Sequence, residues 1–185
     1  LADILSGDVN PSGRLPYTYP KYEQGLITYD HKPGQNMEGK MEGAYDYGAQ
    51  TSVQYPFGFG LSYTTFEYSD LVVENKEFVS GDTIRISFDV KNTGTASGKE
   101  TVMLFSRDMI ATLSPDVRRL RAFEKISLNP GEIKTISLKV PADDLAYVNE
   151  KWKWVLEAGE FMLQTGNLTE KIVCKENKNW ETPNK

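Results

Sequence analysis

The chain has 185 residues, of which 39% are hydrophobic and 25% are charged, and its formal net charge is −5. This length allows one domain with a full core, or one domain and part of another. Acidic and basic residues are interspersed, so no nucleic-acid surface is expected. No stretch approaches the ~18 apolar residues of a membrane span. Cys174 is the single cysteine, which excludes an internal disulfide and a cysteine-based metal site. His31 is the single histidine and has no Cys nearby in the sequence. No metal or cofactor is therefore expected.

The N-terminal residues read as the end of a helix. Leu1, Ile4 and Leu5 are at helical spacing, and Gly7 can end the helix at the left-handed position. A helix this short cannot bury an apolar face alone. Residues 1–20 are therefore predicted to be the C-terminal remnant of an α/β domain, and the start of the chain suggests a piece of a longer polypeptide.

Residues 21–65 are predicted to form a long irregular loop followed by an aromatic hinge. The loop, residues 21–54, is far longer than the ~12–15 residues that are already uncommon in a compact domain, which favours a functional or disordered segment. The hinge, Tyr55–Phe66, combines aromatics with Gly58 and Gly60 and indicates a rigid joint. The aromatics predicted to pack against a neighbouring domain are Tyr55, Phe57, Phe59 and Tyr63.

Residues 66–175 carry the β pattern. Apolar residues alternate with polar ones between Ile84 and Val90, as in a half-buried strand. About eight short strands separated by turns predict an all-β fold, an antiparallel β-sandwich of the immunoglobulin or fibronectin type III class. A type II turn is expected at 129–131, a hairpin turn at 157–160, and a frayed polar tail at 176–185. The predicted strands are 68–73, 84–90, 100–106, 120–128, 136–140, 152–156, 161–165 and 171–174.

An ordered series of motifs resembles glycoside hydrolase family 3. The run Asp3–Pro16, DILSGDVNPSGRLP, resembles the end of the second, α/β domain of these enzymes, and Tyr55–Phe66 resembles the junction that follows. Further motifs resemble their C-terminal fibronectin type III-like domain: Lys91–Gly94 (KNTG), Gly98–Glu100 (GKE), Leu120–Lys125 (LRAFEK), Pro130–Glu132 (PGE) and Gly159–Phe161 (GEF).

The resemblance implies an exo-acting, retaining β-glycosidase of the β-glucosidase or β-xylosidase type, acting on a β-linked oligosaccharide or glycoside. The family's aspartate nucleophile and glutamate acid/base lie in upstream domains of the same polypeptide, so no catalytic residue is expected here and the isolated chain is expected to be inactive. The implied role is to buttress the catalytic domains. A periplasmic or extracellular location and dimerisation of the isolated piece are further expectations.

The loop Tyr29–Lys32 is the candidate for substrate contact. In the intact enzyme, Asp30, His31 and Lys32 would form hydrogen bonds with sugar hydroxyls, and Tyr29 would stack on a sugar ring. The sequence of this loop is similar to that of a loop in some relatives, which has Asn at the position of Asp30. The alternative is an exposed loop with a solvated histidine. Tyr45, Asp46 and Tyr47 either reach substrate or pack in an interface.

Other candidates have equally open interpretations. Trp152 and Trp154 are predicted on one strand face, either as a sugar-stacking platform or as packing residues. Arg14 is expected to form an ion pair within the missing domain, with substrate contact as the alternative. Arg118, Arg119 and Arg121 indicate a solvated or interdomain strand edge, and Asn167-Leu168-Thr169 fits a glycosylation acceptor in a eukaryotic secretory context only. The competing functions are an autonomous carbohydrate-binding module and an adhesion-type sandwich.

Overall fold

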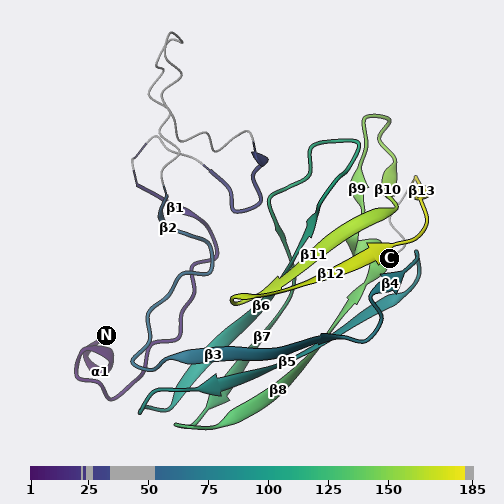
Figure 1. Ribbon diagram of the computed structural model, residues 1–185. Coiled ribbons are helices and arrows are strands. Elements are labelled where there is room, and N and C mark those ends of the chain that lie inside the picture. Colours follow the sequence, from purple (N-terminus) through teal and green to yellow (C-terminus); the bar gives the residue numbers. More distant parts are fainter. Residues whose placement is uncertain (22, 24–26, 34–52, 182–185) are drawn as a thin grey trace, which may run out of the picture.

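The computed structural model describes residues 1–21, 23, 27–33 and 53–181, and the statements below concern these residues (Figure 1). They form a β-sandwich with an N-terminal segment lying beside it, and the predicted all-β class is confirmed.

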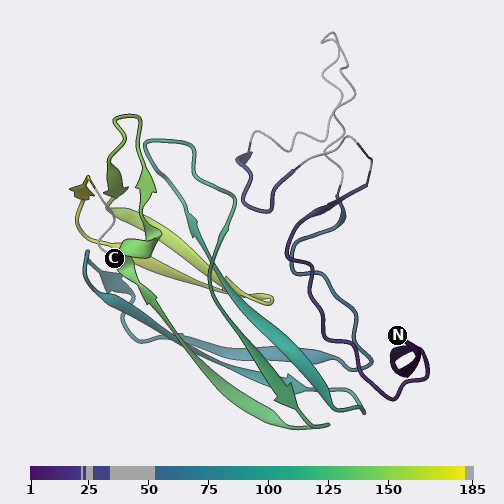
Figure 2. The same ribbon diagram turned by 180° about the vertical axis from the view of Figure 1, so that it is seen from behind.

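Two packed sheets make the sandwich (Figures 1 and 2). The larger sheet has the strand order β4-β12-β11-β6-β7, and the smaller has the order β3-β5-β8. All neighbours pair antiparallel except β12 and β4, which are parallel. The strands are β3 (Phe66–Val73), β4 (Glu77–Phe78), β5 (Thr83–Asn92), β6 (Gly98–Asp108), β7 (Arg119–Leu128), β8 (Ile133–Pro141), β11 (Gly159–Thr165) and β12 (Leu168–Cys174).

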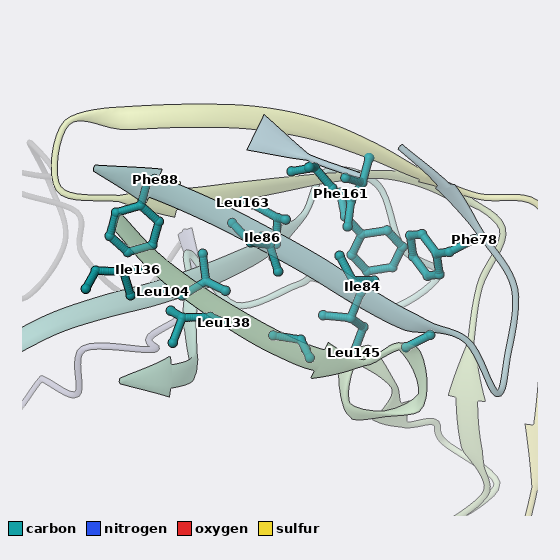
Figure 3. Packing of buried hydrophobic residues seen from close by; sticks show 14 of the residues in the cluster. Phe78, Ile84, Ile86, Phe88, Leu104, Ile136, Leu138, Leu145, Phe161 and Leu163 are labelled. Carbon is teal, nitrogen blue, oxygen red and sulfur yellow. The ribbon is translucent and has the colours of Figure 1, made fainter. Parts of the chain in front are cut away.

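The core follows from the alternation read in the sequence. Every second residue of β5 is buried, and the same holds for the second half of β8. Because β5 and β8 pair with Ile86 opposite Leu138 and Phe88 opposite Ile136, their apolar faces coincide and point at the larger sheet (Figure 3). Leu104 and Leu163 meet them from the larger sheet.

Strand β6 carries a bulge. Its register with β7 shifts between Leu104 and Phe105, and Leu104, Phe105 and Ser106 are buried in succession. The sequence had allowed either burial on both faces or a bulge for this run, and the strand has both features. Phe105 is consequently available to contacts outside the core.

The turn at 129–131 is confirmed. The amide of Glu132 donates to the Asn129 carbonyl at 3.0 Å, and Gly131 has φ +76°, as position three of a type II turn requires.

A third small sheet corrects three predictions. Its order is β13-β10-β9, and its strands are β9 (Tyr147–Val148), β10 (Trp154–Leu156) and β13 (Lys178–Trp180), preceded by the 3-10 helix η2 (Ala142–Leu145). Residues 178–180 are therefore a strand, not a frayed tail. Residues 157–158 connect β10 to β11 of a different sheet, and residues 159–160 already belong to β11, so residues 157–160 are not a hairpin turn. Trp152 lies in the β9–β10 turn with φ +59°, so it does not share a strand face with Trp154.

The N-terminal segment begins with the helix α1 (Ala2–Leu5), as predicted, and Gly7 follows with φ +89°. Two short strands, β1 (Tyr19–Pro20) and β2 (Val53–Tyr55), then pair antiparallel and bring the two ends of the long loop together (Figure 1).

Candidate functional site

The segment 12–15 and the hinge run side by side along the sandwich (Figure 1). The Leu15 amide donates to the Phe59 carbonyl, and the Gly58 amide donates to the Leu15 carbonyl, both at 2.9 Å. Glycine is required at position 60 because a Cβ there would lie 2.1 Å from the Gly13 carbonyl oxygen. The two segments therefore form one joint.

Arg14 anchors this joint to the sandwich. Its guanidinium forms an ion pair with Glu100 of β6 and donates to the Gly60 carbonyl at 2.7 Å. Tyr68 donates to the other Glu100 oxygen at 3.0 Å, and burial together with the Glu100 charge raises the pKa of Tyr68. The expected ion pair of Arg14 within a missing domain is therefore wrong, since its partner belongs to the sandwich.

Asn10 makes a second anchor. Its side-chain oxygen accepts from the Tyr63 amide at 2.8 Å and from the Ser62 hydroxyl at 3.0 Å, while its amide donates to the Ser97 carbonyl at 2.9 Å. Tyr63 in turn donates from its hydroxyl to the Ile4 carbonyl at 2.6 Å. The Tyr63 hydroxyl thus contacts the chain's own helix.

The candidate loop lies on the sandwich. The Tyr29 ring stacks on Phe57 with centroids 4.3 Å apart, and both rings contact Phe105 edge-on at 6.3 Å. Arg118 covers the other side of Phe105, its guanidinium carbon 4.7 Å from the ring centroid. Phe57 is therefore packed against the chain's own sandwich, a contact that the aromatic content of the hinge alone did not predict.

Asp116 fixes the far end of the same loop. One carboxylate oxygen lies 2.5 Å from Lys32 Nζ and the other 2.8 Å from Arg119 Nε. The Val117 amide donates to the His31 carbonyl at 2.9 Å, and a His31 ring nitrogen lies 2.8 Å from the Thr28 carbonyl oxygen. The connection between β6 and β7 therefore holds His31 and Lys32, whereas Tyr29 rests on Phe57 and Phe105, and Asp30 is half-buried. Substrate contact by these four residues stays a prediction, and Tyr45, Asp46 and Tyr47 lie outside the described residues.

Four aromatic rings form a row on the opposite side of the joint. Tyr17 and Tyr19 are 6.2 Å apart, Tyr19 and Tyr55 are 6.0 Å apart, and Tyr55 stacks on Phe59 at 4.7 Å. All four are exposed, by 36% to 52%. We call these residues the aromatic row. Of the hinge residues expected at a domain interface, Tyr55 and Phe59 are in the row, whereas Phe57 faces the sandwich.

A cavity of about 300 Å³ opens between the β6–β7 connection and the strands β9 and β10. Its wall includes Asp108, Asp116, Arg121 and Trp154. Burial raises the pKa of Asp108 to about 6, although the Ile110 amide donates to its carboxylate at 3.1 Å. Arg121 donates from Nε to the Ser106 hydroxyl at 2.6 Å and from a terminal nitrogen to the Asp144 carbonyl.

The described residues contain no group of three or more His, Cys, Asp or Glu side chains placed to hold a metal ion. Among the same residues, no helix has the length and apolar character needed to cross a membrane.

Comparisons with known proteins agree with this architecture. Residues 100–169 match the fibronectin type III-like domain family, and residues 1–63 match the glycosyl hydrolase family 3 C-terminal domain. The chain thus combines a fibronectin type III-like sandwich with part of a glycosidase domain. The chain corresponds to the C-terminal part of glycoside hydrolase family 3 enzymes: the end of the α/β domain and the sandwich after it.

The individual relatives include β-glucosidases and β-xylosidases. The thermostable β-glucosidase B of Acetivibrio thermocellus is 40% identical over 95% of this chain and 24% of its own length. The periplasmic β-glucosidase of Salmonella typhimurium is 34% identical over 90% of this chain and 22% of its own. A solved β-glucosidase of Erythrobacter marinus superposes with a TM-score of 0.82 at 32% identity, covering 94% of this chain and 23% of its own. The chain therefore spans about a quarter of the length of the relatives it matches.

Proposed function

We propose that the chain is the C-terminal accessory region of a retaining, exo-acting β-glycosidase of the β-glucosidase type, and that it buttresses catalytic domains upstream in the same polypeptide. The observation that carries this proposal is the exposed aromatic row, which lies on residues matching the family 3 C-terminal domain. Exposed aromatic clusters are typical of surfaces that another domain covers. When no domain covers the row, it favours dimerisation.

The reaction needs two carboxyl groups ~5–5.5 Å apart across a sugar pocket. In our proposal both belong to the upstream domains, and the substrate is a β-linked glucoside or oligosaccharide. Tyr29, Asp30, His31 and Lys32 contribute to the rim of the sugar pocket. The contacts of Asp116 with Lys32 and of Val117 with His31 would keep this rim in place. The sandwich therefore affects catalysis only by positioning the rim of the sugar pocket.

The location we propose is periplasmic or extracellular. Its support is the relative from Salmonella typhimurium, which is named a periplasmic β-glucosidase.

Hydrolysis of an aryl β-glucoside tests the proposal. The 185-residue chain is expected to show none, whereas a polypeptide that also contains the upstream domains is expected to be active. Within that longer polypeptide, replacing Tyr19 and Tyr55 together by Ser should loosen the domain contact and lower the thermal stability of the catalytic domains. Hydrolysis by the 185-residue chain itself would contradict the placement of the carboxylates.

A second candidate is an autonomous carbohydrate-binding module, and Trp152 favours it. This side chain is 86% exposed at the tip of the β9–β10 turn, where a sugar ring could stack. Titrating the chain with cellobiose or xylobiose separates the two functions. Millimolar or tighter binding that Trp152→Ala abolishes would favour the module.

A further inference from the structure

The cavity beside Trp154 has no role in the function proposed above. It lies between the β6–β7 connection and the strands β9 and β10, no residue of the aromatic row lines it, and its volume of about 300 Å³ is at the small end of ligand pockets. Such a volume suits a ligand of monosaccharide size. The wall combines two aromatic side chains, Tyr147 and Trp154, with charged side chains of both signs.

Arg121 is the basic side chain of the wall for which the described residues supply no ion pair. Both of its hydrogen-bond partners among the described residues are neutral oxygens, the Ser106 hydroxyl and the Asp144 carbonyl. A guanidinium has five N–H donors, so these two bonds leave three. Desolvation lowers the pKa of Arg121 to about 10, which leaves the group charged at neutral pH. The charges of Asp144 and Asp116 lie near enough to favour the charged form, but among the described residues neither carboxylate is hydrogen-bonded to the guanidinium, so an anion can still bind at its remaining donors.

The two carboxylates of the wall are not equivalent. Asp116 already has Lys32 and Arg119 at its two oxygens, so its charge is compensated. Asp108 is the carboxylate that remains, and it has only the Ile110 amide as a donor. Asp108 therefore opposes an anion in the cavity, and it offers oxygens that can accept from ligand hydroxyls.

We propose that this cavity binds a hexuronate, with the carboxylate on the free donors of Arg121 and the sugar ring along Trp154. A guanidinium can hold a carboxylate through two parallel hydrogen bonds, which fixes the orientation of the ligand. The indole supplies an apolar wall for the ring, and Asp108 accepts from the hydroxyls. The site uses only residues of this chain, so it stands independently of the proposed glycosidase role.

The test is a titration of the 185-residue chain with glucuronate, in which binding is monitored through the NMR resonance of the Trp154 indole. We expect a saturable shift in the millimolar range with glucuronate and none with glucose. Arg121→Gln should weaken binding at least about tenfold, because it removes the ligand's counter-charge. Asp108→Asn should tighten binding about threefold to tenfold, because it removes the opposing charge. Arg107→Gln, an exposed neighbour on β6, should change the affinity less than about twofold.

Several outcomes would overturn the assignment. They are a glucuronate titration without any shift, equal binding of glucose, and binding of sulfate as tight as that of glucuronate. Asp108→Asn keeps the test decisive if Arg121→Gln does not fold, since a folded Asp108→Asn chain with unchanged affinity also contradicts it.

Discussion

Asp108 makes the stability of the sandwich depend on pH. Its carboxylate lies at the end of β6 beside the cavity, and burial raises its pKa from 3.8 to about 6. The folded state therefore binds the proton more tightly than the unfolded state. The stability contributed by this group is complete below pH 4 and is lost as the pH rises through 6. Asp108→Asn removes the titration and keeps an oxygen that can accept from the Ile110 amide.

The size of the effect follows from the two pKa values. Their difference corresponds to about 3 kcal/mol if the group were fully desolvated. Asp108 is only half-buried, and solvent screening reduces the expected gain of Asp108→Asn to about 1 kcal/mol above pH 6.5. For a chain of this length, this is an increase in Tm of roughly 2–4 °C. Near pH 4 the two proteins should be equally stable.

Urea unfolding of the 185-residue chain between pH 4 and pH 8 measures this directly. The wild-type and Asp108→Asn curves should meet at low pH and separate as the pH rises. Glu150→Gln, an exposed carboxylate in the β9–β10 turn, is the control and should run parallel to the wild type. Parallel curves for Asp108→Asn as well, or a larger gain at pH 4 than at pH 8, would refute the reasoning.

Three further predictions concern the joint and the loop. Phe57→Ala should lower the free energy of unfolding, measured by urea unfolding, by about 2 kcal/mol, because Phe57 packs against Tyr29 and Phe105. Phe59→Ala should lower it by less than about 1 kcal/mol. Equal losses would contradict the different orientations of the two side chains. In the longer polypeptide, Asp116→Asn should raise KM for an aryl β-glucoside more than it lowers kcat, and it should change the free energy of unfolding by less than about 1 kcal/mol. Lys171→Gln, which removes an exposed ion pair elsewhere, is the control. An unchanged KM in Asp116→Asn would show that the loop does not contribute to substrate binding. Tyr19→Ser with Tyr55→Ser should shift the 185-residue chain toward the monomer in light scattering, and an unchanged mass would exclude the aromatic row as the contact between copies.

The sandwich could be predicted from the sequence because its evidence is local. The alternation from Ile84 to Val90 fixes a strand and its buried face without knowledge of its partner. The turn at Asn129–Gly131 is equally local, since proline and glycine limit the backbone angles directly.

The errors came where the partner is distant in the chain. Residues 178–180 have no readable alternation, and they form a strand only because β10 offers a free edge to Trp180 and its neighbours. Arg14 and Glu100 are separated by 86 residues, so no spacing rule could pair them. The positive φ of Trp152 and the orientation of Phe57 likewise depend on tertiary packing, which overrides local preference.

The β1–β2 pair has a consequence for how such proteins diversify. Two short strands hold the ends of the long loop together, with Tyr19 opposite Tyr55. The entropy of closing a flexible loop grows only with the logarithm of its length, so doubling the loop costs about 0.6 kcal/mol. A change in the number of residues between the two strands should therefore cost the sandwich little, as long as Tyr29 keeps its contact with Phe57 and Lys32 its ion pair with Asp116.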